Sequence, residues 1–169
     1  METERLELIP LTAEQLKLWL ENLPALEREL SCSYQGEPLK DGFRSVVAGQ
    51  CALISAHPAD YLWGTFWLLI RKSDRSVVGS ADFKRPPDGG GEVEIGYGLA
   101  PGFEHNGYMT EAVRAMTAWA LKQPGVRAVT AETERYNLAS QRILERCGYA
   151  RYRQGETLWW KAASRGRSE

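Results

Sequence analysis

The stretch from residue 92 to residue 149 constrains this chain most, because its pattern reads strand, glycine loop, helix, strand and helix in close succession. A strand pattern over 93–99 stops at Pro101, and the loop 102–107 then opens into an amphipathic pattern over 108–121. A glycine loop at a helix N-terminus presents unpaired N–H groups and the positive end of the helix dipole. Such a terminus suits phosphate or pyrophosphate. The sequence therefore predicts a phosphorylated ligand, held by main chain at the end of a strand.

Length and composition are those of an ordinary globular protein. The chain has 169 residues, of which 43% are hydrophobic and 25% charged, enough for one domain with a substantial core. We expect a single domain over residues 1–163. The polar stretch 164–169 is expected to be a flexible tail.

Charge and hydropathy limit the partners. The net charge of −1 favours neither nucleic acid nor a membrane surface as a partner. No apolar run approaches the roughly 20 residues of a membrane span, and residues 1–5 lack the pattern of a signal peptide. Together with three scattered cysteines, which do not suggest a disulfide framework, this predicts a cytoplasmic location.

A metal site is not expected. The cysteines at 32, 51 and 147 show no C-x-x-C spacing, and the only histidines are His57 and His105. This set does not resemble the ligand clusters of zinc proteins.

Hydrophobic periodicity gives a coarse map of the elements. Helices are predicted over 12–21, 24–30, 38–55, 108–121 and 138–147, and strands over 5–9, 63–70, 77–83, 92–99, 128–133, 149–154 and 157–161. Thr12 is expected to cap the first helix, and Gly148 to end the last one in a left-handed conformation. The predicted class is α+β, with a mixed central sheet of about six to seven strands and helices on both faces.

Three motifs carry a family resemblance. Residues 3–6 read TERL, residues 94–101 read EIGYGLAP and are followed by GYMTEA at 107–112, and residues 137–149 read NLASQRILERCGY. In order and spacing they resemble the GNAT superfamily of acetyl-CoA-dependent N-acetyltransferases, and within it the branch of ribosomal-protein N-terminal acetyltransferases. The resemblance implies a GNAT-like domain, acetyl-CoA as co-substrate and an amine as acceptor. It leaves open whether the protein is a monomer or a homodimer.

The resemblance also implies where the cofactor binds. Its pyrophosphate would lie on the loop and first helical turn, formed by Glu104, His105, Asn106, Gly107, Tyr108 and Met109. Two residues depart from the family pattern, since Glu104 is acidic where a basic or amide residue is usual, and Met109 is bulky where a small one is. Backbone N–H groups can bind phosphate whatever the side chains are. Because the backbone must approach the ligand closely at Met109, we expect the Met109 side chain to point into the core.

Glu94 is the candidate general base, because the resemblance places a carboxylate on this strand. The alternative is that Glu94 is a solvated residue on a strand face. The N–H groups of Leu99 and Ala100 would serve as an oxyanion hole at a bulge that the family implies after the strand.

The helix 138–147 supplies the remaining candidates. Asn137 is expected near the thioester arm, and Ser140 is a possible proton donor to the departing thiolate. The structural alternative for Asn137 is that it is the N-cap of this helix, with Ser140 satisfying local backbone. Many members of the superfamily have a tyrosine acid here, but residues 143–145 contain none.

The predicted function is therefore transfer of an acetyl group from acetyl-CoA to a primary amine by direct attack. The acceptor could be a protein N-terminus or a small-molecule amine such as a polyamine, an amino acid or an antibiotic. The alternative is a non-catalytic acyl-CoA-binding relic of the same fold, which the two departures in the loop suggest.

Overall fold

The computed structural model describes residues 1–163, so the predicted tail 164–169 lies outside the described residues. The strands are β1 Leu6–Pro10, β2 Ser33–Tyr34, β3 Phe66–Arg71, β4 Ser76–Phe83, β5 Glu92–Leu99, β6 Ala128–Glu134, β7 Ala150–Gln154 and β8 Thr157–Ala163. The helices are α1 Ala13–Glu21, α2 Leu23–Leu30, α3 Asp41–Ala56, α4 Tyr61–Gly64, α5 Tyr108–Ala120 and α6 Leu138–Arg146, with 3-10 turns at Pro58–Asp60 and Pro101–Phe103.

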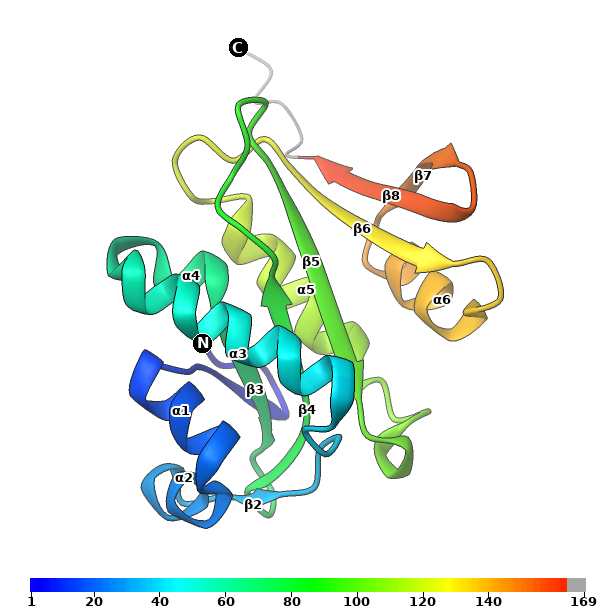
Figure 1. Ribbon diagram of the computed structural model, residues 1–169. Helices are drawn as coiled ribbons and strands as arrows, with labels where there is room; N and C mark the ends of the chain where they lie inside the picture. Colours follow the sequence, from blue (N-terminus) through cyan, green and yellow to red (C-terminus); the bar gives the residue numbers. More distant parts are fainter. Residues whose placement is uncertain (164–169) are drawn as a thin grey trace.

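The strands form one mixed sheet in the order β1-β3-β4-β5-β6-β8-β7, with β2 pairing in parallel with β4. The α+β class with helices on both faces is confirmed (Figure 1), although the eight strands exceed the predicted six or seven. The strand that was missed is β2, whose two residues are too few to show a period. The helices α1 to α3 lie over β3 and β4 on one face, whereas α5 and α6 lie on the other. The short helix α4 packs with Leu62 and Trp63 against the cluster on the α5 side.

The start of the third strand differs from the prediction. Trp63 lies in the short helix α4, and β3 begins only at Phe66. The Trp63 ring packs against the rings of Phe83 and Trp119, at centroid distances of 5.1 and 5.0 Å. This aromatic packing between distant segments stabilises a helical turn in a stretch whose composition favours a strand.

Strands β5 and β6 pair only at their first residues and then diverge. The parallel register runs from Glu92 opposite Ala128 to Glu94 opposite Thr130. Beyond this point β5 pairs only with β4, and β6 pairs only with β8. The two strands open from each other like the arms of a V (Figure 1).

The divergence exposes one backbone edge of β5. The N–H of Ala100 donates to the Val78 carbonyl, and the carbonyl of Glu94 accepts from Lys84, so even-numbered residues bond toward β4. Backbone groups of successive residues point to opposite sides of a strand. The backbone N–H and C=O groups of Tyr97 and Leu99 therefore point away from β4, into the opening between β5 and β6. No strand among residues 1–163 pairs with that edge.

Candidate active site

The loop before α5 ends in an uncapped helix N-terminus. Gly107 is the N-cap, with a φ of 78°, and no side chain within residues 1–163 caps the helix. The first helical hydrogen bond runs from the Glu111 N–H to the Gly107 carbonyl, at 3.1 Å. The N–H groups of residues 108–110 precede that bond and point out of the helix end, where the helix dipole is positive. This terminus has the free N–H groups that the predicted anion site requires.

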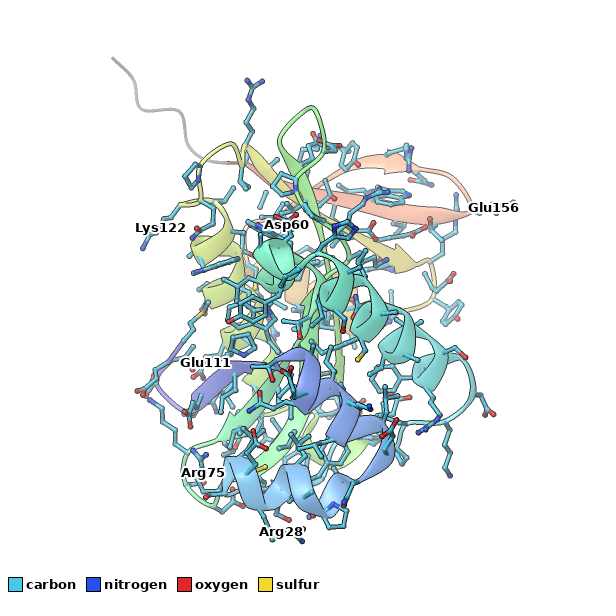
Figure 2. The ribbon with its side chains drawn as sticks, turned by 60° about the vertical axis from the view of Figure 1, so that its left-hand side comes forward. Arg28, Asp60, Arg75, Glu111, Lys122 and Glu156 are labelled. Atoms are coloured by element: carbon cyan, nitrogen blue, oxygen red, sulfur yellow. The ribbon has the colours of Figure 1, made fainter. Side chains whose placement is uncertain are left out.

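The N-terminal segment holds this loop in place. The Arg5 guanidinium donates to the Asn106 carbonyl at 2.8 Å and lies 4.5 Å from the centroid of the Tyr108 ring. The Glu111 carboxylate accepts from the Arg5 backbone at 2.7 Å and from the Arg5 side chain at 2.8 Å, and it also accepts from Thr3. Figure 2 shows Glu111 beside β1. The TERL motif thus braces the loop, a role that its sequence alone does not reveal.

Met109 is 2% exposed and belongs to the core, as expected, so it offers the site only its N–H. Tyr108 is also buried, whereas Glu104 and His105 are exposed. The Glu104 N–H already donates to the Pro101 carbonyl at 3.3 Å, so this amide is not free for a phosphate. The Asn106 side chain donates to the carbonyls of Phe103 and Glu104 and shapes the loop from within.

Glu94 lies on the face of β5 that α3 covers. Val93 and Ile95 are buried with α5, and alternation places Glu94, Gly96 and Gly98 on the opposite side. The Glu94 side chain is only 11% exposed and forms an ion pair with Lys84. The solvated-face alternative is therefore wrong for Glu94.

The predicted oxyanion hole needs a correction. The Ala100 N–H donates to the Val78 carbonyl at 3.0 Å, so it belongs to the β4–β5 ladder. The register between β4 and β5 also runs without a shift up to Leu99, so the expected bulge does not interrupt this pairing. The N–H of Leu99, which faces the opening, remains as a candidate donor.

Asn137 is the N-cap of α6, since its side-chain oxygen accepts from the Ser140 N–H at 3.1 Å. The capping alternative is thus confirmed for Asn137. The Ser140 hydroxyl lies 2.7 Å from the Tyr97 hydroxyl, which reaches it from β5. Burial raises the pKa of Tyr97 to about 12, although the Ser140 hydrogen bond lowers it.

Tyr97 is a candidate that the sequence analysis missed. It alternates with Val93 and Ile95 on β5, and this spacing alone could have placed it on the face toward α5 and α6. The sequence resemblance points to helix 138–147 for a tyrosine acid, whereas the structure brings a tyrosine from β5 to Ser140 of that helix. Within residues 1–163 no group of histidine, cysteine and acidic residues could hold a metal ion, and no helix is long and apolar enough to cross a membrane.

The helix terminus is suited to phosphate and lies at the end of a strand whose outer edge is free, an arrangement that could take a nucleotide-type cofactor. Residues 5–150 match the model of the Acetyltransferase (GNAT) domain, and the chain belongs to this family. GNAT acetyltransferases use acetyl-CoA.

Comparisons with individual proteins agree with this assignment. The chain is 35% identical over 83 residues to the uncharacterized N-acetyltransferase YjdG of Bacillus subtilis (strain 168), a match that spans 49% of each protein. The fold is similar to that of a putative GNAT-family acetyltransferase from Bordetella pertussis, with a TM-score of 0.67, 23% identity and coverage of 96% of this chain and 98% of that one. It is also similar to RimL, a ribosomal L7/L12 alpha-N-protein acetyltransferase in complex with coenzyme A, with a TM-score of 0.64, 16% identity and 95% of each chain covered.

Proposed function

We propose that this protein transfers the acetyl group of acetyl-CoA to a primary amine by direct attack of the amine on the thioester. The observation that carries the proposal is the placement of the uncapped α5 terminus at the end of β5, directly beyond the edge that β6 leaves free. The acceptor class proposed is a protein N-terminus or a small-molecule amine.

The backbone supplies most of the proposed cofactor contacts. The N–H groups of residues 107–110 would hold the pyrophosphate, and the free edge of β5 would align the pantetheine arm by main-chain hydrogen bonds. The side chains of Glu104, His105 and Asn106 border the same loop. The burial of Met109 removes one of the two reasons for the alternative of a non-catalytic relic.

The proposed chemistry divides between the two faces of β5. The Leu99 N–H would donate to the thioester carbonyl oxygen and favour attack on its carbon. On the α6 side, Ser140, hydrogen-bonded to Tyr97, would protonate the departing sulfur, with Asn137 fixing the start of α6. On the α3 side, Glu94 is a candidate to accept the proton of the amine, although Lys84 already neutralises its charge.

The test is calorimetric titration with acetyl-CoA followed by an amine screen with mass detection. We expect binding, and for at least one amine an acetylated product about 42 Da heavier than the amine, because one hydrogen is replaced by an acetyl group. Binding without a product from any peptide N-terminus, polyamine or amino acid would support the relic. Absence of binding by the folded protein would refute the cofactor site.

A further inference from the structure

A buried carboxylate lies under α3, on the face of the sheet opposite α5. Asp82, on β4, is 7% exposed, and its Oδ2 accepts from the Gln50 side-chain amide at 2.9 Å. Its other oxygen, Oδ1, has no hydrogen bond within residues 1–163.

The oxygen Oδ1 lies over Gly96, which has no side chain of its own, and the Lys84 Cε lies 3.7 Å from the position of the missing Cβ. Asp82 pairs with Gly96 of β5, and a Cβ built on Gly96 would lie 2.7 Å from Oδ1. Gly98 lies on the same face of β5, and the Glu37 carboxylate is 3.8 Å from the position of its missing Cβ. A ligand resting on the two glycines would meet Oδ1 beside the edge of β5 at which the thioester is proposed to lie.

The side-chain oxygen of Gln50, the residue that bonds Asp82, also lacks a donor within residues 1–163. Gln50, on α3, is 8% exposed, and its side-chain oxygen Oε1 is buried without a hydrogen-bond partner among the described residues. A buried acceptor without a partner is costly. The ammonium group of an amine offers three N–H donors, which suits Asp82 Oδ1 and Gln50 Oε1 together.

The neighbouring charges distinguish Asp82 from Glu94. Glu94 forms an ion pair with Lys84, so its carboxylate already has a cationic partner. Asp82 has only the neutral amide of Gln50 as a direct partner. Burial raises the pKa of Asp82, against the lowering effects of Gln50 and Lys84 and with a further rise from Glu94.

We propose that Asp82, presented by Gln50 over Gly96, takes the proton from the acceptor amine before it attacks. The proposal rests on the proposed function and names the proton acceptor of that same site. The ammonium gives one proton to Oδ1, and the neutral amine forms the new C–N bond as the C–S bond breaks. The second proton lost by the nitrogen balances the one gained by the thiolate on the α6 side, and Asp82 then releases its proton to water.

The test compares pH–rate profiles of the wild type, Asp82→Asn and Glu94→Gln with an amine from the screen. Asparagine keeps the size of the side chain and an oxygen for the Gln50 bond, but it cannot take the proton. We expect Asp82→Asn to lose about 10²- to 10⁴-fold in kcat and to lose the fall in rate at acidic pH, the acidic limb of the profile. The profile of Glu94→Gln decides between the two candidate bases. If Asp82→Asn retains the limb, or if only Glu94→Gln removes it, the proposal is refuted.

Gln50→Leu adds a second test, because a Gln50 that only stabilised the fold would leave the pH–rate profile unchanged. In the wild type the Gln50 hydrogen bond favours the ionised carboxylate and lowers the pKa of Asp82. The substitution removes this bond, so the acidic limb should move to higher pH. An unmoved limb in a folded Gln50→Leu variant would contradict the role of Gln50 in presenting Asp82.

A third readout does not depend on turnover. A carboxylate whose pKa is raised by folding costs stability as pH rises above its unfolded value of about 3.9. The melting temperature of Asp82→Asn, relative to wild type, should therefore increase from pH 4 to pH 8, while acetyl-CoA affinity stays within about twofold. A flat difference would refute the buried base. If no amine is acetylated by the wild type, the proposed function fails too, whereas turnover with a normal Asp82→Asn refutes only this inference.

Discussion

Substitution of Gly107 by alanine tests the cofactor site most directly. Gly107 has a φ of 78°, where an L-residue is strained, and a Cβ there would lie 3.4 Å from the Arg5 guanidinium. The residue stands between the loop and the first free N–H groups of α5. A relaxed backbone at this point would turn those N–H groups away from a bound phosphate.

The size of the effect follows from these contacts. The left-handed conformation costs a residue with a Cβ about 1–2 kcal/mol, which lowers the melting temperature of a chain of this size by about 2–8 °C. Loss of one hydrogen bond to a charged group costs about 1.5–3 kcal/mol. We therefore expect acetyl-CoA to bind about 10- to 150-fold more weakly.

Gly125→Ala is the matched control. Gly125 has a φ of 80° and open space around its missing Cβ, and it lies in the turn between α5 and β6. Both variants should lose similar stability by thermal unfolding, but only Gly107→Ala should lose affinity by calorimetric titration. Equal affinities in a folded Gly107→Ala variant would show that the pyrophosphate binds elsewhere.

Two further predictions concern the other side of β5 and the brace of the loop. Tyr97→Phe removes the hydroxyl bonded to Ser140, so kcat should fall about tenfold or more with KM for acetyl-CoA unchanged. A normal rate constant in single-turnover kinetics would exclude Tyr97 from proton delivery. Burial disfavours the Glu111 charge, but hydrogen bonds from Thr3 and Arg5 outweigh it and lower the pKa of Glu111. Its stabilisation is therefore present above the unfolded pKa of about 4.3 and lost as pH falls. Glu111→Gln should cost about 1–2 kcal/mol in urea unfolding at pH 7 and much less at pH 3, and an equal cost at both would contradict the ion pair.

Local signals predicted much of the fold. Thr12 caps α1 in a reciprocal capping box with Gln15, and Gly148 has a φ of 85° at the end of α6, as their sequence contexts indicate. The strand, loop and helix over 92–121 also lie where periodicity places them. These features depend on residues close in sequence.

The parts that were missed depend on pairings between distant segments. Trp63 takes a helical turn because aromatic rings from β4 and α5 surround it. The Ala100 N–H is engaged because β4 continues beside it to Val78, which no pattern in the loop could reveal. Asp82 lies in a run read only as a strand, and its surroundings come from α3 and from the register with Gly96.

Strand β5 explains why one short segment can serve both proton transfers of the proposed reaction. Successive side chains point to opposite faces, so Tyr97 reaches Ser140 on the α6 side while Gly96 leaves room for Asp82 on the α3 side. The backbone N–H of Leu99 points along a third direction, into the opening that β6 leaves. A proton donor and a proton acceptor on one face could neutralise each other through a direct hydrogen bond. The strand keeps the Tyr97–Ser140 pair and Asp82 on opposite faces, so a thioester along the edge of β5 would have the proton donor on one side and the proton acceptor on the other.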